Sequence, residues 1–228
     1  MMLYRVLTAE AGILSLQHGN LRLGNALEFN DPYDSLLALR HADSHVPQEQ
    51  LDAAAQKQRE TQFSQYGVLC MTEKPQSSCL WSHYADKHRG IALGFDFQQA
   101  GDSLFKVNYS ETRPALDISE ETKPGDPKAM DQIIKCLTTK SADWSYEQEY
   151  RVILPISNPL VTKTTMEGKA KHFIPMPHQL REIILGYQCC EQDRERIYEI
   201  TRSSYPWPIC IKQAKLSSDS FEMAFIHG

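Results

Sequence analysis

The hydrophobic positions of the chain follow two spacings, one typical of strands and one typical of helices. Short runs that alternate between apolar and polar residues, or that are apolar throughout, indicate strands. Such runs lie at residues 3–7, 68–71, 91–95, 106–109, 150–154, 172–176, 182–185, 209–216 and 221–226. The last two runs are separated by Ser217-Ser218-Asp219, so we expect them to form a β-hairpin.

Apolar residues spaced three or four apart predict helices between these strands. Thr8 is suited to cap a helix that ends at Gly19, and Ser77 or Ser78 to cap a helix that ends at Gly90. Further helices are expected at 47–66, where Gly67 closes the helix, and at 192–201. A last helix is expected after an Asp126-Pro127 cap, and it should bury Met130, Ile133, Ile134 and Leu137. The polar segment 110–126, which contains Pro and Gly, predicts a surface loop.

The order of these elements indicates the fold class. Helices dominate the first part of the chain and strands the last third, which is typical of α+β proteins. The 228 residues contain no internal repeat and no long Gly/Ser linker. We therefore expect residues 1–228 to form a single domain in which a split, mainly antiparallel β-sheet is flanked by helices.

Composition excludes several classes of function. The net charge of −5 argues against the basic face that broad nucleic-acid binding requires. No apolar run approaches the roughly 18 residues of a membrane span, and the first residues lack the pattern of an export signal. We therefore expect a cytoplasmic protein with no membrane partner and with its six cysteines reduced. GxGxxG, P-loop, GxSxG and CxxC patterns are absent from the sequence, which argues against the nucleotide, hydrolase and zinc sites that use them.

Charged residues enter the apolar strand predicted near residue 150. On a strand, Glu147, Glu149 and Arg151 share one face. One interpretation is surface pairing between glutamate and arginine, which contributes little to stability. The other is a pair of carboxylates that project into a cleft and stabilise a developing cation.

The helix that precedes the strand at 91–95 carries an unusual set of side chains. Trp81 and Tyr84 share one helical face, where Trp81 either packs in the core or contacts a ligand. Tyr84 at the rim of a cleft would stack on a flat ligand, because a phenol needs a polar partner when it is buried. A metal site formed by His83, Asp86 and His88 is the weaker alternative to solvation of the helix end.

Two further segments are candidates for a binding site. Arg5 lies in an apolar strand and needs an anionic partner, for which Glu147, Glu149 and a ligand phosphate are the candidates; a structural salt bridge is the alternative. Asn30 and Asp31 precede Pro32 in a turn of the Asx type, which would also be suited to border a pocket.

Taken in order along the chain, these segments resemble a known family. The resemblance spans about residues 3–186 and is carried by Tyr4-Arg5, Asn30-Asp31-Pro32-Tyr33, Leu69-Cys70-Met71-Thr72, Trp81 to Gly90 and Trp144 to Arg151. The family is the bacterial and phage group catalogued as domain of unknown function 2971, for which no activity is implied.

A second resemblance does imply an activity. The order of elements is similar to the ADP-ribosyltransferase core, especially that of poly(ADP-ribose) polymerases, with Gly19-Asn20-Leu21-Arg22, residues 68–95 and Glu147-Gln148-Glu149 in the corresponding places. This resemblance implies that Arg5 holds NAD and that Tyr84 stacks on nicotinamide, with Ser82 as the alternative helix residue. It also implies that Glu149 is the catalytic glutamate and that Glu147 engages the acceptor. Trp81, Asn30 and Asp31 complete the expected NAD contacts, and no metal is required.

The favoured expectation is therefore NAD-dependent ADP-ribosyl transfer, or NAD glycohydrolysis, in a toxin or phage-defence role. The acceptor is a protein, a nucleic acid or a small molecule, and a neutralising antitoxin or regulatory protein is a further candidate partner. One alternative is a non-catalytic module of a defence system that binds a nucleotide or a protein. Another is a hydrolase or nuclease that uses Asp31, Glu147 and Glu149 with a divalent cation.

Overall fold

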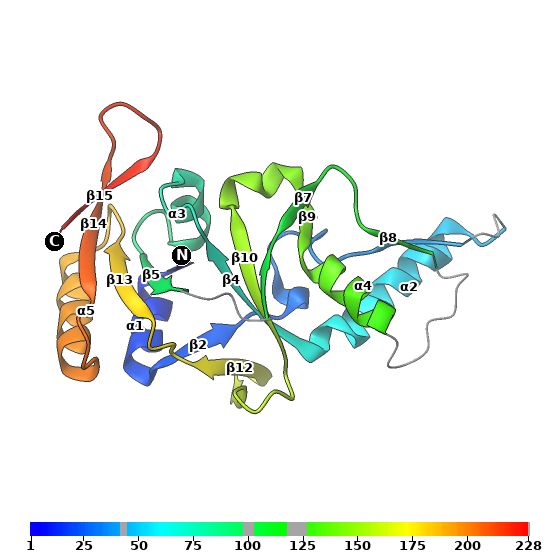
Figure 1. Cartoon of the computed structure of the whole chain (residues 1–228), viewed down its shortest axis with the longest axis horizontal. Coiled ribbons are helices and arrows are strands. Elements are labelled where there is room, and N and C mark those ends of the chain that lie inside the picture. The colour runs from blue at the N-terminus through cyan, green and yellow to red at the C-terminus, as the bar shows by residue number, and fades with distance from the viewer. Residues whose placement is uncertain (42–44, 98–102, 118–126, 228) are drawn as a thin grey trace.

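An eight-stranded β-sheet forms the centre of the protein in a computed structural model that describes residues 1–41, 45–97, 103–117 and 127–227 (Figure 1). Its strands, in spatial order, are β15 (Met223–His227), β14 (Cys210–Leu216), β13 (Leu180–Leu185), β5 (Ile91–Asp96), β1 (Met2–Leu7), β4 (Tyr66–Thr72), β10 (Glu149–Pro155) and β6 (Leu104–Lys106). All neighbouring pairs are antiparallel except β13 and β14, which are joined through a helix. The sheet confirms the expected α+β class with mainly antiparallel pairing.

Shorter strands lie beside this sheet in three groups. β11 (Thr162–Met166), β12 (Lys169–Pro175) and β2 (Asn20–Leu23) form a three-stranded antiparallel sheet. β3 (Ala38–Arg40) pairs with β8 (Ala115–Asp117), and β7 (Asn108–Ser110) pairs with β9 (Thr139–Ser141), both in parallel. β9 and β11 carry too few apolar residues to be recognised from the sequence pattern, and β3 is only three residues long.

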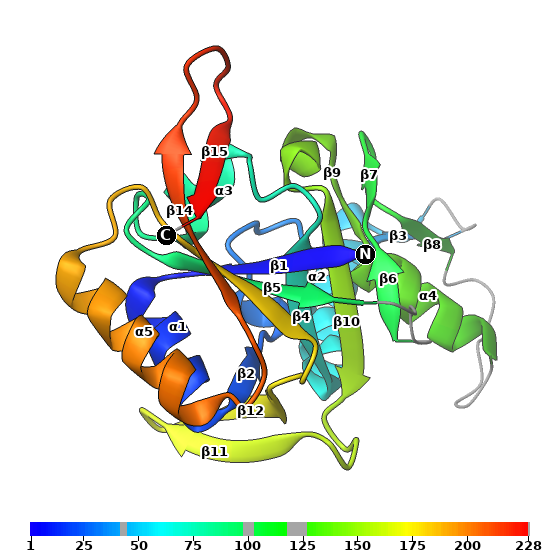
Figure 2. The ribbon, with the colours of Figure 1, turned by 60° about the vertical axis from the view of Figure 1, so that its left-hand side comes forward.

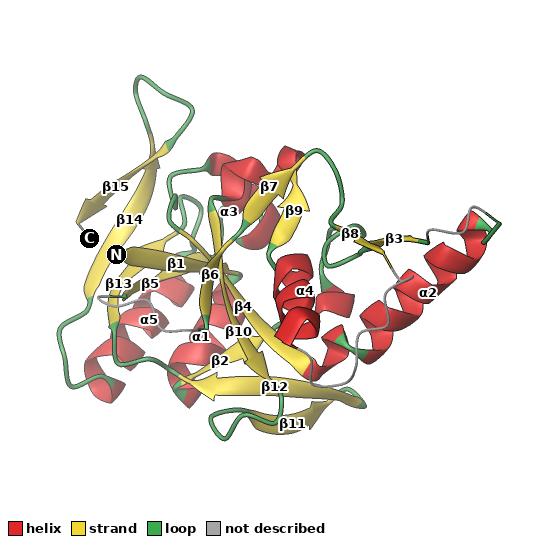
Figure 3. Cartoon of the chain, turned by 45° about the vertical axis from the view of Figure 1, so that its right-hand side comes forward, coloured by secondary structure: helices red, strands yellow, loops and turns green. Residues whose placement is uncertain are grey.

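Five helices of the described residues cover the central sheet. They are α1 (Ala9–His18), α2 (Gln48–Thr61), α3 (Ser78–Tyr84), α4 (Pro127–Leu137) and α5 (Glu191–Ser204). α1 and α5 lie side by side at one end of the molecule (Figure 2), and α2 and α4 lie at the other end (Figure 3). One apolar cluster joins α1 and α5 to the sheet, a second lies under α2 and α4, and a third lies under α3.

The first helix has the ends that the sequence predicts. The Thr8 hydroxyl accepts a hydrogen bond from the backbone N–H of Ala11 at 3.2 Å. Gly19 adopts a left-handed conformation with φ 59° directly after the helix, a geometry that glycine adopts without steric cost. Three short 3₁₀ helices at Ala26–Glu28, Phe63–Gln65 and Ala142–Glu147 complete the regular structure of the described residues.

Two predicted helix ends are wrong. The helix expected at 47–66 ends at Thr61, because Phe63 turns into the second apolar cluster and Tyr66 already starts β4, which includes Gly67. The helix expected to end at Gly90 stops at Tyr84 and is followed by a turn with positive φ at residues 86–88. Gly90 is needed for a different reason: a Cβ there would lie 2.0 Å from the Leu7 carbonyl oxygen.

The strand predicted at 106–109 is divided between two sheets. Lys106 ends β6 in the central sheet, and Asn108 starts β7, which pairs with β9. Val107 between them is buried, and its backbone N–H donates to the carbonyl of Glu149 at 2.9 Å. The predicted loop at 110–126 contains β8, while residues 118–126 and the expected cap at Asp126 lie outside the described residues.

Other expectations have mixed outcomes. The C-terminal hairpin of β14 and β15 is confirmed, and all six cysteines are free thiols. On α4, Leu137 is buried as expected but Met130 is 47% exposed. None of the described helices is long and apolar enough to span a membrane.

Candidate functional site

The start of β10 carries two charged side chains into the interior. Glu149 and Arg151 lie opposite Thr72 and Cys70 of β4, and they are only 4% and 1% exposed. The expectation that Glu147 extends the same strand face is wrong, because Glu147 ends a 3₁₀ helix and Gln148 turns the chain with φ 43°. The pairing of glutamate and arginine is therefore buried and not on the surface.

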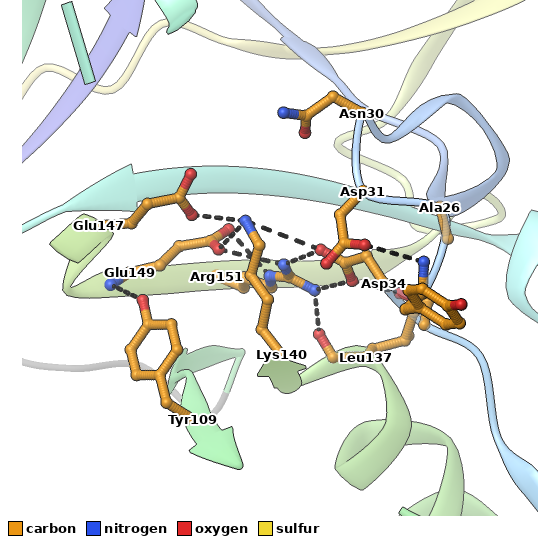
Figure 4. A network of polar contacts seen from close by, with 12 residues as sticks. Ala26, Asn30, Asp31, Asp34, Tyr109, Leu137, Lys140, Glu147, Glu149 and Arg151 are labelled. Atoms are coloured by element: carbon orange, nitrogen blue, oxygen red, sulfur yellow. Dashed lines mark hydrogen bonds and ion pairs between the residues drawn. The ribbon is translucent and has the colours of Figure 1, made fainter. Parts of the chain in front are cut away.

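Arg151 uses all of its donors inside the protein (Figure 4). Its Nη1 and Nη2 atoms donate to the two carboxylate oxygens of Asp34 at 2.9 and 2.6 Å. Its Nε and Nη2 atoms also donate to Glu149 at 2.9 and 3.1 Å, and Nη1 donates to the carbonyl of Leu137 at 2.7 Å. This bidentate geometry fixes Asp34 and Glu149 on two adjacent edges of one guanidinium group, with Nη2 shared between them.

Lys140 of β9 is the second buried cation of this network. Its Nζ atom contacts Glu147 at 2.5 Å, Glu149 at 3.4 Å and Asp34 at 3.9 Å. The second carboxylate oxygen of Glu147 accepts a hydrogen bond from the Tyr84 hydroxyl at 2.7 Å. Glu147 therefore connects the buried charges to a half-buried phenol on α3. We call Asp34, Lys140, Glu147, Glu149 and Arg151 the charged network.

The two glutamates differ in their electrostatic environment. Burial alone would raise the pKa of Glu149, but Arg151 and Lys140 outweigh it and lower this pKa from 4.5 to about 2. Burial raises the pKa of Glu147, and the charge of Glu149 adds to the rise while Lys140 opposes it. Burial and the adjacent Glu147 raise the pKa of Tyr84, which keeps its hydroxyl protonated. Glu149 is thus held as a carboxylate, whereas Glu147 is the group poised to exchange a proton.

Asp31 adds a further carboxyl group beside the network. It is 3% exposed, and its Oδ1 atom accepts from the backbone N–H of Tyr33 at 2.9 Å, which confirms the predicted Asx turn. Its Oδ2 atom is buried and has no hydrogen-bond partner in the described part of the chain. Figure 4 shows this side chain directed toward Asp34 and Lys140. With Asp31 included, four carboxyl groups lie beside the two cations Lys140 and Arg151.

Tyr84 and three neighbouring aromatic side chains form a cluster that we call the aromatic rim. Its members are His83, Tyr84, Trp144 and Tyr146. The ring of His83 stacks on Tyr146 with centroids 6.3 Å apart and lies 5.8 Å from Trp144. The Nζ atom of Lys140 lies 4.6 Å from the centre of the Trp144 ring, so the rim and the charged network are in contact. Each rim side chain is partly or fully accessible to solvent.

The structure brings together five of the residues singled out from the sequence. Glu147 bonds Tyr84, Glu149 shares Lys140 with Glu147, and the Oδ1 atom of Asn30 lies 3.4 Å from the Tyr84 hydroxyl. Asp31, the fifth of them, lies beside these groups in the turn that Asn30 begins. Tyr84 and Glu149 therefore meet at one site through Glu147 and Lys140, whereas Arg5 is not among the residues that the structure joins there.

The other candidates lie apart from this site. Arg5 donates to the carbonyl of Cys70 at 2.8 Å and forms no ion pair with any described carboxylate, so the expected pairing with Glu147 or Glu149 is wrong. Trp81 is fully buried and donates to the carbonyl of Pro75 at 2.7 Å, which agrees with core packing. Ser82 is exposed on α3 and makes no contact with the charged network.

Sequence reasoning missed Asp34 and Lys140. Asp34 closes the same polar turn that begins at Asn30, and the buried arginine on β10 required an acidic partner, so a signal for Asp34 was present. Lys140 follows two threonines in a polar segment that carries no such signal.

The donor set does not favour a metal centre. Within the described ranges, no group of three His, Cys, Asp or Glu side chains is placed to hold a metal ion. In the charged network, the Lys140 ammonium lies between the carboxylates of Glu147 and Glu149. His83, considered for a metal, belongs to the aromatic rim.

Residues 80–152 match the family model described as protein of unknown function (DUF2971). The match supports the first resemblance noted in the sequence. It covers most of α3, all of β9 and the start of β10. It therefore includes the aromatic rim and four of the five residues of the charged network: Lys140, Glu147, Glu149 and Arg151. No curated protein and no solved structure matches the chain at a significant level.

Proposed function

We propose that the protein binds NAD at the aromatic rim and cleaves the bond between nicotinamide and ribose, with transfer of ADP-ribose to an acceptor or to water. The observation that carries this proposal is the Glu147 carboxylate, buried beneath the aromatic rim and bonded to Tyr84 at 2.7 Å. The nicotinamide ring of NAD is flat and positively charged. Aromatic faces attract such a cation, and so does the surplus of carboxyl groups in the charged network.

The chemistry requires a carboxylate at the ribose. The bond from ribose C1 to the nicotinamide nitrogen breaks, and its electron pair leaves with nicotinamide. The transition state then carries positive charge on the ribose, which a fixed carboxylate stabilises. The acceptor atom, or a water oxygen, forms the new bond to the same carbon, and its proton passes to Glu147 and then to solvent.

Glu147 and Glu149 have different roles in this proposal. Glu149 is fixed by Arg151 and Lys140 and is remote from solvent, so it acts as a positioning residue that holds Lys140 beside Glu147. Glu147 is one hydrogen bond from the rim and is the proposed catalytic residue. This assignment reverses the order that the resemblance to ADP-ribosyltransferases implies. A toxin or defence role, and the acceptor and neutralising partner that go with it, stay predictions.

The second candidate function is a binding module that recognises a nucleotide without cleaving it. It is favoured by the complete pairing of Arg151 and by the Tyr84 hydroxyl that covers Glu147, since a purely structural network needs no reacting group. Binding without nicotinamide release separates this candidate from the transferase.

The test is release of nicotinamide from NAD by purified protein, with and without cell lysate as a source of acceptor. We compare the wild type with Glu147→Gln and with Glu28→Gln, a matched change in an exposed ion pair. We expect Glu147→Gln to lose activity at least about 100-fold, as for removal of a transition-state partner, while circular dichroism shows a folded protein. Full activity in folded Glu147→Gln, or no release by the wild type in either condition, would overturn the proposal.

A further inference from the structure

A recess of about 210 Å³ borders the charged network at Lys140. It is lined by Tyr33, by the loop at residues 110–114 and by β9. Drug-sized ligands occupy roughly 300–1,000 Å³, so this recess is suited to one part of a ligand and not to a whole dinucleotide. β7 and β9 frame it (Figure 3), and Lys140 of β9 contacts Glu149 of β10 and the Trp144 ring of the aromatic rim.

The most basic side chain in this lining is Arg113. It is exposed, and its guanidinium carbon lies 6.0 Å from the centre of the Tyr33 ring. Among the described residues, no carboxylate lies within ion-pair distance of Arg113. Tyr33 is 62% exposed, which leaves both groups accessible from the recess. Arg113 is therefore held against an aromatic ring with no acidic partner in the described part of the chain.

The rest of the lining offers mainly hydroxyl groups. Ser110, Thr112, Thr139 and Ser141 contribute to it, and Glu111 is its one acidic residue. The Ser110 hydroxyl accepts from the backbone N–H of Thr112 at 3.1 Å and donates to the carbonyl of the same residue at 2.8 Å. This turn orders the loop that presents Arg113 and leaves the Thr112 hydroxyl directed at no described partner.

We infer that this recess binds the diphosphate group of a nucleotide, with Arg113 as its principal contact. The planar guanidinium donates two parallel hydrogen bonds to phosphate oxygens, and the Thr112 hydroxyl donates to a third. The other lining hydroxyls, those of Ser110, Thr139 and Ser141, already donate within the protein. The assignment to NAD rests on the proposed function, because Lys140 lines the recess and also contacts Glu147. In this assignment the phosphate groups contact Arg113 and not Arg5, because the guanidinium of Arg5 already donates to the carbonyl of Cys70 on β4.

The first measurement is calorimetric binding of inorganic pyrophosphate, which requires no turnover. Arg113→Gln is compared with Arg202→Gln, because Arg202 is also exposed and lies 5.9 Å from the centre of the Tyr198 ring, on α5. We expect Arg113→Gln to raise the Kd about tenfold, the effect of one charge-assisted contact, and Arg202→Gln to leave it unchanged. Glu111→Gln removes a like charge from the lining and should lower the Kd about threefold, an effect that general loss of structure would not produce.

A second measurement connects the recess to the reaction. Arg113→Gln should raise the KM for NAD without changing turnover of nicotinamide riboside, which lacks the diphosphate. Equal pyrophosphate affinity in the wild type and Arg113→Gln, or no pyrophosphate binding at all, would refute the inference. If pyrophosphate binding depends on Arg113 but no variant releases nicotinamide, the anion site stands and the proposed reaction fails.

Discussion

Replacement of Glu149 with glutamine removes one buried negative charge and leaves the shape of the side chain almost unchanged. In the wild type this charge faces Arg151 Nε at 2.9 Å, Arg151 Nη2 at 3.1 Å and Lys140 Nζ at 3.4 Å. The glutamine side chain still reaches these groups, but Arg151 and Lys140 then lose a compensating charge in an environment with little solvent.

The size of the effect follows from the pKa of Glu149. A pKa lowered from 4.5 to about 2 corresponds to about 3 kcal/mol of free energy of unfolding, at about 1.4 kcal/mol for each pKa unit. Loss of one partner from a buried pair costs a similar amount, about 3–5 kcal/mol. For a chain of 228 residues, about 3 kcal/mol lowers the Tm by roughly 6–12 °C.

The pH dependence has a defined sign. Because the folded-state pKa is depressed, the stabilisation by Glu149 is fully present above about pH 4.5 and is lost as the pH falls toward 2. The glutamine variant lacks this contribution at every pH. The difference in unfolding free energy between wild type and Glu149→Gln should therefore shrink by about half or more between pH 5 and pH 3.

The assay is urea unfolding followed by circular dichroism at pH 7, 5 and 3. The matched control is Glu28→Gln, which breaks exposed pairs with Arg22 at 2.7 Å and Lys171 at 2.6 Å and should cost under about 1 kcal/mol. Equal stability of wild type and Glu149→Gln at pH 7 would refute the reasoning. So would a deficit of the same size at pH 5 and pH 3.

Three other outcomes follow from the same contacts. Lys140→Met removes the cation that three buried carboxyl groups share, and urea unfolding at pH 7 should show a loss of about 3–5 kcal/mol. A loss below about 1 kcal/mol would contradict the charged network. Trp81→Phe removes the donor to the Pro75 carbonyl in the core and should lower the free energy of unfolding by about 1–3 kcal/mol. The KM for NAD should be unchanged, and an altered KM would show that Trp81 takes part in NAD binding. Because burial raises the pKa of Glu147, this carboxyl group ionises above pH 4.5, and the rate of nicotinamide release should increase with pH in that range. A rate that is flat above pH 4.5 would contradict the assignment of Glu147 as the catalytic residue.

The sequence alone was sufficient for elements whose signals are local. Thr8 and Gly19 mark the ends of α1 because a cap and a left-handed turn depend on residues within one helical turn. The apolar run at 91–95 is a central strand because it is buried on both faces, and continuous apolar runs reflect that burial. The cluster of Glu147, Glu149 and Arg151 was visible for the same reason, since these residues are close along the chain.

Only the tertiary structure decided what these residues contact. Asp34 and Arg151 are 117 residues apart, and Lys140 reaches Glu147 and Glu149 from a separate two-stranded sheet. The division of 106–109 between two sheets and the bond from Arg5 to Cys70 also depend on strand pairing. Local spacing carries no information about such pairs, because partners in a sheet are selected by the burial and register of the whole fold. Glu147, Glu149 and Arg151 could be read from the sequence, whereas the addition of Asp34 and Lys140 and the partners of each charge came from long-range packing.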